Sequence, residues 1–343
     1  LIARGHHSQL VLTPATRLAD FAQQQGLSPI YLKRRSRAFP LLAARRLARL
    51  VDTLEIDILQ LHWGHDLALG VFAKRMARRR VHLVYMRHME IPHPKHDPWH
   101  RFLYRHVDTL LTITQEMKQQ ALERIPMVAR DIRHLYLGAA APAAQVPCAR
   151  FYQSTGLSPR AFKIGLFGRI EPGKGQHLLV GAVARMHAAG LPVQAAIIGH
   201  AMDRAYAEAL RAHIEREQLS AHIHLIDHVP DAASLMGCCD VVTLTTRKET
   251  FGLVLVEAMR AGVAVVATRA GGPCEIIEDG VSGLLFTPGD ELSLHDALHR
   301  LVADPALRMR LAKAGRARAD SLFDEQRHFA QMEQVLSEMA ALA

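Results

Sequence analysis

Two glutamates of this 343-residue chain stand on either side of a glycine that opens an apolar segment. Glu249 and Glu257 lie eight positions apart, and Gly252 opens the apolar segment that carries Glu257. Residues 252–261 are apolar except for Glu257 and Arg260, so we expect them to form a helix. Burying a carboxylate on such a helix costs several kcal/mol unless hydroxyls or amides hydrogen-bond to it, and a ligand rich in hydroxyls would do so.

The start of this expected helix favours an anion. We expect Thr250 to be the N-cap, and Gly252 has no side chain to block an approach to the backbone. The N–H groups of Gly252, Leu253 and Val254 would then point out of the helix N-terminus without partners inside the helix. A helix end of this kind readily binds a phosphate.

A second segment, residues 168–175, follows an expected strand and opens an expected helix with the sequence Gly-Arg-Ile-Glu-Pro-Gly-Lys-Gly. It matches the start of a P-loop, which requires a Ser or Thr hydroxyl for Mg²⁺ directly after the lysine. Gly175 stands there instead, so we do not interpret the segment as the P-loop of an NTPase. A surface loop with ordinary charges is the plain alternative.

The two segments together resemble the donor-binding domain of retaining GT-B glycosyltransferases, in particular glycosyltransferase family 4. That family carries E-x-F-G-x4-E, then A-x3-G, an apolar strand and G-G-x-x-E, and its donor domain opens with G-R-x4-K-G. The first pattern is present here as Glu249, Phe251, Gly252, Glu257, Ala258, Gly262, Gly271, Gly272 and Glu275. The resemblance covers most of the second half of the chain specifically and the first half in outline.

The resemblance implies a role for each matching residue. Arg169 and Lys174 would hold the diphosphate of a nucleotide sugar, Glu257 its ribose hydroxyls, and Glu249 the hydroxyls of the donor sugar. Each of two fixed cations beside a helix N-terminus can stabilise the charge on a leaving diphosphate by about 2–4 kcal/mol in the transition state. The implied donor-binding set is Gly168, Arg169, Lys174, Glu249, Phe251, Gly252, Leu253, Val254 and Glu257. The plain alternatives are a surface carboxylate for Glu257 and a charge that favours the helix dipole for Glu249.

His88 is the candidate catalytic residue of the first half, alongside Arg169, Lys174 and Glu249 of the second. It follows an expected strand at residues 81–86, where many family members place a histidine near the reacting sugar. The resemblance implies that His88 orients the sugar or polarises its hydroxyls and forms no covalent intermediate. His62 also closes an expected strand, and it could line the same cleft or serve packing.

Strands and helices alternate along the whole chain, which predicts α/β domains with parallel sheets. With the resemblance, this predicts GT-B: two doubly wound, Rossmann-like domains facing a cleft. We expect a first domain at residues 1–140, a linker at 141–160, a donor domain at 161–323 and a C-terminal helix at 324–343 that packs back on the first domain. The first strand and glycine-rich loop of the family are absent from the sequence before residue 9.

The resemblance implies a hexosyltransferase that moves a sugar from a UDP- or GDP-linked donor to a glycan or lipid-linked acceptor, with retention. No Asp-x-Asp cluster accompanies the motifs, so we expect neither a metal nor a further cofactor. Two alternatives stay open: a non-catalytic protein that binds nucleotide sugars as a scaffold, and a GT-B sugar-nucleotide epimerase.

Basic residues concentrate in the first half of the chain. Residues 1–150 hold 23 Lys+Arg and 11 Asp+Glu, a net charge of +12, and the remainder holds 19 and 22, a net charge of −3. The Lys-Arg-Arg-Ser-Arg run at 33–37 beside apolar 38–42 predicts an anionic partner such as a membrane surface, and solvated arginines are the plain alternative. No recognition motif supports nucleic acid.

The rest of the composition predicts a cytoplasmic protein, peripheral on the inner face of the membrane. No apolar run reaches the length of a membrane span, and the start of the sequence has no signal-peptide layout. The four cysteines form no disulfide framework and no metal pattern, which suits a reducing compartment.

Overall fold

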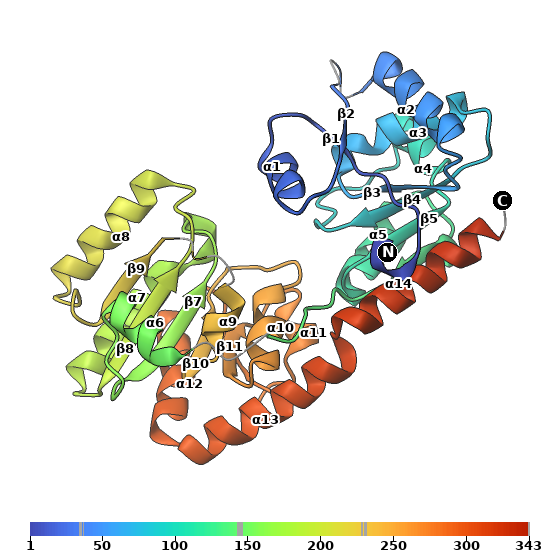
Figure 1. Ribbon diagram of the computed structural model, residues 1–343. Coiled ribbons are helices and arrows are strands. Elements are labelled where there is room, and N and C mark those ends of the chain that lie inside the picture. Colours follow the sequence, from blue (N-terminus) through green and yellow to red (C-terminus); the bar gives the residue numbers. More distant parts are fainter. Residues whose placement is uncertain (34–35, 37, 143–146, 228, 230–231, 342–343) are drawn as a thin grey trace. The chain divides into compact units, whose positions relative to one another are not determined.

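Two parallel sheets, each in its own unit of the chain, organise the computed structural model (Figure 1). The structure describes residues 1–33, 36, 38–142, 147–227, 229 and 232–341. The first unit comprises Leu1–Leu135 and Phe329–Ala343, and the second comprises Tyr136–His328.

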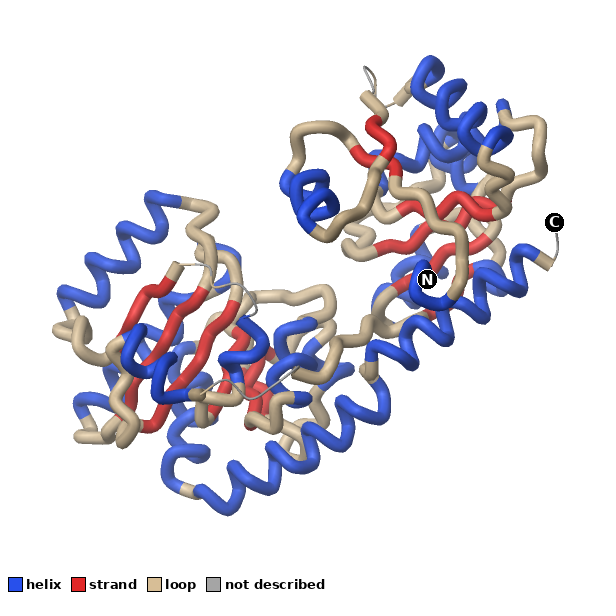
Figure 2. Tube along the Cα trace, in the orientation of Figure 1, coloured by secondary structure: helices blue, strands red, loops and turns tan. Residues whose placement is uncertain are grey.

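The second unit is built on a six-stranded parallel sheet in the order β12-β11-β10-β7-β8-β9. Its strands are rich in Val, Ile and Ala, and β10 and β11 are buried along their whole length. Strands of this kind require helices on both faces of the sheet, as Figure 2 shows. The strands are β7 (Phe162–Phe167), β8 (Val193–Ile198), β9 (Ile223–Ile226), β10 (Val241–Leu244), β11 (Ala264–Thr268) and β12 (Leu284–Phe286). The helices are α6 (Cys148–Thr155), η4 (Pro172–Lys174), α7 (Gln176–Ala188), α8 (Arg204–Arg216), α9 (Ala232–Met236), α10 (Leu253–Arg260), α11 (Pro273–Ile276), α12 (Glu291–Ala303) and α13 (Pro305–Leu322).

The winding of this sheet reverses beside its central strand. From β7 the chain moves outward to β8 and β9, and it then returns to β10 on the other side of β7. The carboxyl ends of β7 and β10 therefore lie next to each other, and the connections that follow them diverge. Open parallel sheets bind ligands at such a point.

The first unit contains a four-stranded parallel sheet in the order β3-β4-β5-β6 and a separate parallel pair, β1 and β2. Its strands are β1 (Val11–Leu12), β2 (Ile30–Tyr31), β3 (Ile58–Leu61), β4 (His82–Arg87), β5 (Thr109–Thr112) and β6 (Ile132–His134). Its helices are η1 (Ile2–Arg4), α1 (Arg17–Gln24), α2 (Leu41–Thr53), η2 (Gly64–Asp66), α3 (Leu67–Met76), α4 (Pro98–Tyr104), α5 (Gln115–Arg124) and η3 (Ala129–Asp131). None of the helices in the described residues is long and apolar enough to cross a bilayer.

The last helix, α14 (Glu325–Ala340), starts in the second unit and continues into the first. Glu333 on this helix forms ion pairs with Arg4 (2.8 Å) and His6 (2.7 Å), and Glu338 pairs with Arg133 (2.5 Å). These contacts fasten residues after 328 to the first unit.

The contacts of the chain divide it a few residues away from the sequence-based domain ranges: the first boundary lies earlier than expected, and the second lies at 328/329, later than the expected 323/324. The units change between residues 135 and 136, and residues 148–155 of the expected linker 141–160 form α6 in the second unit. Residues 143–146, also in that expected linker, lie outside the described part.

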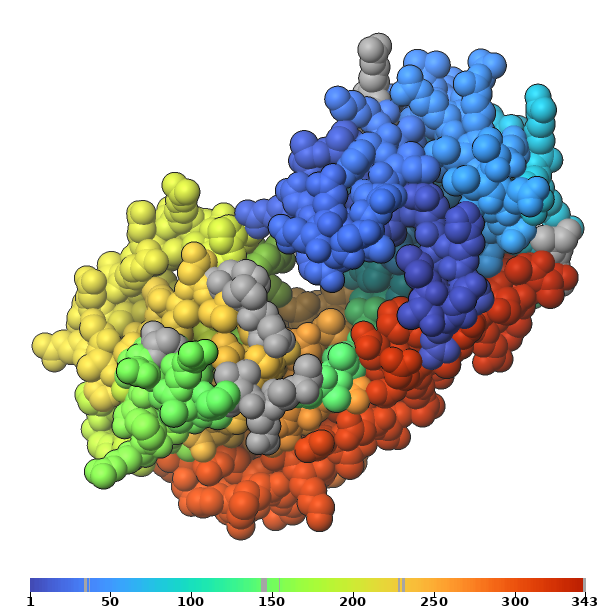
Figure 3. All heavy atoms as spheres, in the orientation of Figure 1, coloured from blue at the N-terminus to red at the C-terminus, as the bar shows by residue number. Residues whose placement is uncertain are grey.

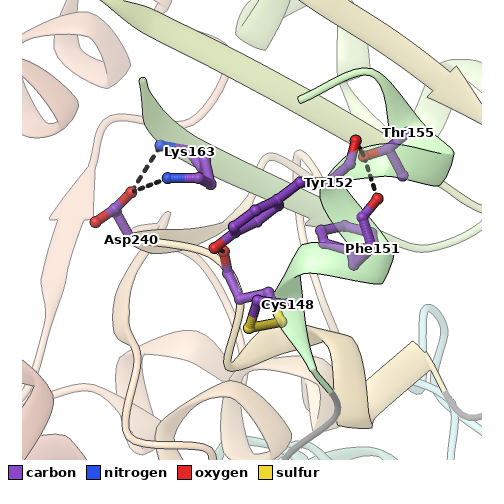
Figure 4. The surroundings of a disulfide bond; sticks show 7 residues. Cys148, Phe151, Tyr152, Thr155, Lys163 and Asp240 are labelled. Atoms are coloured by element: carbon purple, nitrogen blue, oxygen red, sulfur yellow. Dashed lines mark hydrogen bonds and ion pairs between the residues drawn. A yellow bond between two sulfur atoms is a disulfide. The ribbon is translucent and has the colours of Figure 1, made fainter. Parts of the chain in front are cut away.

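A disulfide in the second unit corrects the interpretation of the cysteines. Cys148 at the start of α6 is bonded to Cys238 in the turn before β10, although 90 positions separate them (Figure 4). Tyr152 on α6 donates a hydrogen bond to the carbonyl of Cys238 (2.9 Å) and lies beneath the Lys163 ammonium, 4.9 Å from its ring centroid. The expectation of no disulfide was wrong because the two cysteines meet only through the fold, and the argument for a reducing compartment fails with it.

Local hydrogen bonding explains one shortened helix. The apolar pattern of the sequence predicts a helix over residues 67–80, but α3 ends at Met76, where Ala77 turns to an extended conformation. Asp52 accepts hydrogen bonds from the backbone N–H groups of Arg78 (2.9 Å) and Arg79 (3.0 Å), which directs the chain away from the helix axis.

Candidate active site

Seven of the predicted donor-binding residues line one cavity at the point where the second sheet reverses its winding. The cavity has a volume of about 270 Å³. It is lined by Leu166, Phe167, Gly168, Arg169, Lys174, Leu244, Thr245, Thr246, Glu249, Gly252, Leu253 and Val254. These residues come from the carboxyl ends of β7 and β10, from the loops that follow them and from the N-terminus of α10, which is where open parallel sheets bind ligands.

The loop after β7 is held against the end of β10 by close backbone contacts. Gly175 has a left-handed conformation (φ 67°), and a Cβ there would lie 2.4 Å from the carbonyl oxygen of Thr245. The Thr245 hydroxyl donates to the carbonyl of Lys174 (2.7 Å), and the Gln176 amide donates to the carbonyl of Arg169 (2.8 Å). The position where a P-loop carries Ser or Thr must therefore be glycine here, for a steric reason.

The two cations of this loop differ in exposure and in their partners. Lys174 forms an ion pair with Glu249 (Nζ to Oε2, 2.7 Å), and only about a fifth of either side chain is exposed. Arg169 is 58% exposed and pairs with Glu171 at 3.0 Å. A diphosphate entering the cavity thus meets cations that already have carboxylate partners.

The N-terminus of α10 differs from the expectation in its cap. Thr250 was expected to be the N-cap, but the N-cap is Gly252, in a left-handed conformation (φ 98°) and without a side-chain cap. The chain needs this left-handed turn to enter the helix, and a threonine would resist it. Because no side chain caps the helix end, the N–H groups of Leu253 and Val254 point out of it without a capping partner, and such groups suit an anionic ligand.

The glycine pair of the motif anchors the segment that carries Glu249. The N–H of Gly272 donates to the carbonyl of Glu249 (2.8 Å), and Gly271 forms a bridge with Glu249. A Cβ on Gly272 would lie 2.2 Å from the carbonyl oxygen of Phe251. Only glycine allows the two backbones to approach this closely.

Two further predicted residues of the second unit lie outside the cavity lining. Phe251 is 3% exposed, and its ring packs near those of Tyr136 (6.3 Å) and Phe323 (5.9 Å). Glu257 is half-buried on α10, three residues beyond Val254, which lines the cavity. The structure brings together the residues that were predicted to bind a diphosphate, and the ribose contact of Glu257 stays a prediction.

Two threonines that the sequence motifs did not indicate line the cavity directly after β10. Thr246 is 7% exposed, and its hydroxyl has no hydrogen-bond partner among the described residues. A buried hydroxyl without a partner is costly, so this group favours a ligand that can bond to it. The available signal was position, since Thr245 and Thr246 follow a buried strand at its carboxyl end.

His88 lies in the first unit, immediately after β4. Its Nε2 is 3.0 Å from Nδ1 of His62, which follows the neighbouring strand β3, and the two rings stack. Burial lowers the pKa of His62, which favours a neutral ring near pH 7. The pairing fixes the orientation of both rings at the carboxyl ends of adjacent strands.

Comparisons with known proteins match both halves of the chain. The family of group 1 glycosyl transferases matches residues 151–318, and Glycosyltransferase Family 4 matches residues 1–140. A D-inositol 3-phosphate glycosyltransferase of Stackebrandtia nassauensis is 34% identical over 46% of this chain and 37% of its own length. The lipopolysaccharide core biosynthesis mannosyltransferase LpcC of Rhizobium leguminosarum bv. viciae is 29% identical over 71% of this chain and 67% of its own length. Across such curated relatives, the matched part spans from about a third to two thirds of the relative.

Solved structures share the fold. Anabaena Alr3699/HepE in complex with UDP superposes with a TM-score of 0.84 and 26% identity, covering 96% of this chain and 91% of that one. The same Anabaena protein has also been solved with UDP-glucose. The predicted GT-B architecture is confirmed, and the chain belongs to the group 1 glycosyltransferases, with a first domain of glycosyltransferase family 4.

Proposed function

We propose that this chain is a retaining hexosyltransferase that uses a nucleotide-diphosphate sugar and requires no metal. One observation carries the proposal: Arg169, Lys174, Glu249 and the N-terminus of α10 line a single cavity at the sheet's reversal point. Cations and helix N–H groups together suit a diphosphate, and the hydrogen-bonding carboxylate suits a sugar.

The proposed reaction exchanges one glycosidic bond for another. The bond between the anomeric carbon and the β-phosphate oxygen breaks, and a new bond forms to the acceptor oxygen on the same face. The acceptor proton passes to an oxygen of the departing diphosphate, so the products are a glycoside and a nucleoside diphosphate. Lys174, Arg169 and the α10 N-terminus stabilise the charge on that diphosphate in place of a divalent ion, at about 2–4 kcal/mol for each well-placed group.

The donor is proposed to be a UDP-linked sugar, with a GDP-linked sugar as the other candidate. The Anabaena complexes with UDP and UDP-glucose support this choice, because that protein shares the fold at 26% identity. His88 remains a proposed contact of the donor sugar, on the family resemblance.

Thermal unfolding in the presence of UDP, GDP, ADP, TDP and CMP tests the donor site. A ligand at a hundred times its dissociation constant adds about 2.7 kcal/mol, which raises Tm by several degrees. One nucleoside diphosphate should stabilise the wild type and fail to stabilise Lys174→Ala, while the matched control Lys313→Ala, an exposed lysine of α13, behaves like the wild type. No stabilisation by any of the five would refute the donor site.

Transfer from the stabilising donor, followed by NMR of the product anomer, tests the reaction. Retention of the anomeric configuration is expected, and an inverted product would refute the proposed mechanism. Donor binding without transfer to any lipid-linked or glycan acceptor would favour the scaffold alternative.

We also propose that an anionic membrane leaflet binds the first unit. One face of α2 carries Leu42, Arg45, Arg46 and Arg49 at helical spacing, all exposed, and Leu42 is 74% exposed. Residues of α1 and α2, blue in Figure 3, lie on the visible surface of this unit. Three arginines around one exposed leucine complement the negative cytoplasmic leaflet, at about 1 kcal/mol for each basic residue near the surface. The basic residues 34, 35 and 37, predicted to belong to this surface, lie outside the described part.

Co-sedimentation with vesicles distinguishes this surface from solvated arginines. The chain should bind phosphatidylglycerol vesicles and not phosphatidylcholine vesicles, and Arg45→Glu with Arg46→Glu should abolish the binding. Arg130→Glu is the matched control, because this arginine of the same unit is 84% exposed. Equal loss in the control would reduce the effect to net charge and contradict a specific face.

A further inference from the structure

The chain passes between the two units twice, and the second unit joins the two passages to each other. We call residues 136–139 and 323–328 the crossing junction, because they adjoin the unit boundaries at 135/136 and 328/329. The N–H of Ala139 donates to the carbonyl of Phe323 (3.0 Å), and the N–H of Glu325 donates to the carbonyl of Ala139 (3.2 Å). The His328 ring nitrogen Nδ1 lies 2.7 Å from the carbonyl oxygen of Tyr136. The passages are therefore paired like two short strands.

A close backbone approach reinforces this pairing. A Cβ on Gly138 would lie 2.6 Å from the carbonyl oxygen of Asp324 and 2.7 Å from the Cα of Glu325. Any side chain at this position would separate the two passages. The junction is a tight, specifically built element and not a slack connection.

A buried arginine near the C-terminal end of α10 is hydrogen-bonded to the crossing junction. Arg260 is 8% exposed, and its Nη1 donates to the carbonyl of Ala139 (2.6 Å) and to Asp324 (2.7 Å). Its Nε lies 3.3 Å from a carboxylate oxygen of Asp320. Hydrogen bonds from the N–H of Arg327 and from Arg260 lower the pKa of Asp324, so the pair stays charged at neutral pH.

The other end of the same helix reaches the junction through an aromatic cluster. Phe251, which directly precedes the N-cap of α10, packs near Tyr136 and Phe323, whose rings meet edge to face at 5.1 Å. The hydroxyl of Tyr136 donates to Glu275 of α11 (2.9 Å), at the end of the glycine motif that anchors Glu249. Both passages thus touch the elements that form the donor cavity.

We propose that Tyr136 and Arg260 are positioning residues that couple occupation of the donor cavity to the geometry of the crossing junction. The inference rests on the proposed function, because the donor's diphosphate is the ligand that the N-terminus of α10 receives. α10 is a helix of eight residues with one end at the cavity and the other at the junction. Closely packed elements transmit strain, so a displacement at one end of this helix is felt at the other. A ligand that prefers one position of α10 must favour the junction geometry that matches it, and the coupling is reciprocal.

Tyr136→Phe isolates this coupling, since it removes only the hydroxyl that reaches Glu275 and keeps the aromatic packing. Tyr206→Phe is the matched control, because the Tyr206 hydroxyl is also hydrogen-bonded, to His177 in the same unit (3.1 Å), and touches neither cavity nor junction. Arg260→Gln removes the other link, and Arg260→Lys tests rescue by a cation. Urea unfolding of each variant identifies any that fail to fold.

The experiment measures three quantities with UDP: its Kd by calorimetry, hydrogen exchange of the Ala139 and Glu325 amides, and kcat and donor KM for transfer. In the wild type and in Tyr206→Phe, UDP should slow exchange at both amides. In Tyr136→Phe, UDP should still bind with a Kd within about threefold of the wild type, while the protection is lost and kcat falls by about 3- to 30-fold, the range of single-residue effects on coupling. Arg260→Lys should retain more of the protection than Arg260→Gln.

The outcomes separate the coupling from the donor site itself. If the wild type binds UDP and exchange at the two amides does not change, the coupling is refuted while the donor site stands. If Kd weakens in Tyr136→Phe as much as kcat falls, the residue only supports the cavity, and the coupling is again refuted. If the wild type binds neither UDP nor GDP, the proposed function falls first and the coupling with it.

Discussion

The ion pair between Lys174 and Glu249 yields the sharpest prediction, because the two residues are assigned to different parts of the same ligand. Their charged atoms are 2.7 Å apart, and the side chains are 19% and 20% exposed. A diphosphate must share or displace the carboxylate to reach the ammonium. Hydrogen bonds to charged groups are worth about 1.5–3 kcal/mol net, so releasing Lys174 in advance should return an energy of this order to the ligand.

We therefore expect Glu249→Gln to bind UDP about ten times more tightly than the wild type, at the lower end of that range. The same variant should transfer sugar poorly, because the carboxylate that would hold the sugar hydroxyls is gone. Lys174→Ala should weaken UDP binding and lower kcat by about 10²–10³-fold, as the loss of one preorganised charge does. The two variants thus move UDP affinity in opposite directions.

Calorimetric titration of UDP into the two single variants, the double variant and the control Lys313→Ala completes the test. In the double variant the gain from Glu249→Gln should vanish, because no cation is left to release. Weaker UDP binding in Glu249→Gln would refute the reasoning, since the carboxylate would then support the diphosphate site and not compete for its cation. An equal gain in the double variant would also refute it.

Three further predictions follow from single contacts. Cys148→Ser should lower the free energy of unfolding by about 2–4 kcal/mol, since the bond to Cys238 closes a loop of 90 positions; urea melts with dithiothreitol check this, and the reductant should destabilise the wild type alone. Gly272→Ala should cost about 1–3 kcal/mol and abolish stabilisation by UDP, because its Cβ would meet the Phe251 carbonyl at 2.2 Å, and an unchanged melt would contradict the close approach. Thr246→Val removes a buried hydroxyl without a partner, so the free energy of unfolding should stay equal or rise. UDP binding should weaken by about 0.5–1.5 kcal/mol. A loss of stability without a loss of UDP affinity would contradict a ligand contact.

The sequence predicted best what adjacent residues determine. Apolar periodicity reflects burial within a short segment, and it predicts a strand over residues 193–198 and a helix over residues 291–303. The structure has β8 and α12 at these positions. The cavity could also be anticipated, since Lys174 and Gly252 follow strand ends of one parallel sheet. Because β7 and β10 are neighbours in that sheet, the residues that follow them lie close together whatever the conformation of their side chains.

Contacts between distant residues could not be read in the same way. Cys148 and Cys238 are brought to a Cα separation of 5.3 Å by the packing of α6 on the second unit, and nothing in their spacing indicates it. Helix α6 itself follows an alanine- and proline-rich stretch and was expected to be linker. Thr250 looked like a cap by residue type, but the left-handed entry into α10 decided the cap in favour of Gly252.

At Arg260 the helix dipole links the sequence of α10 to its contacts in the fold. In the sequence it is a charge that interrupts an apolar helix, and its hydrogen-bonded partners lie 121 and 64 positions away. In the structure it is the cation at the C-terminus of α10, where the helix dipole is negative, while the N-terminus of that helix lines the cavity that we propose receives the diphosphate. A short helix with an anion at its first turn and a buried cation at its last is favoured at both ends. Because neither end can shift without the other, a substitution at Arg260 should be judged by UDP affinity and junction exchange together, and not by stability alone.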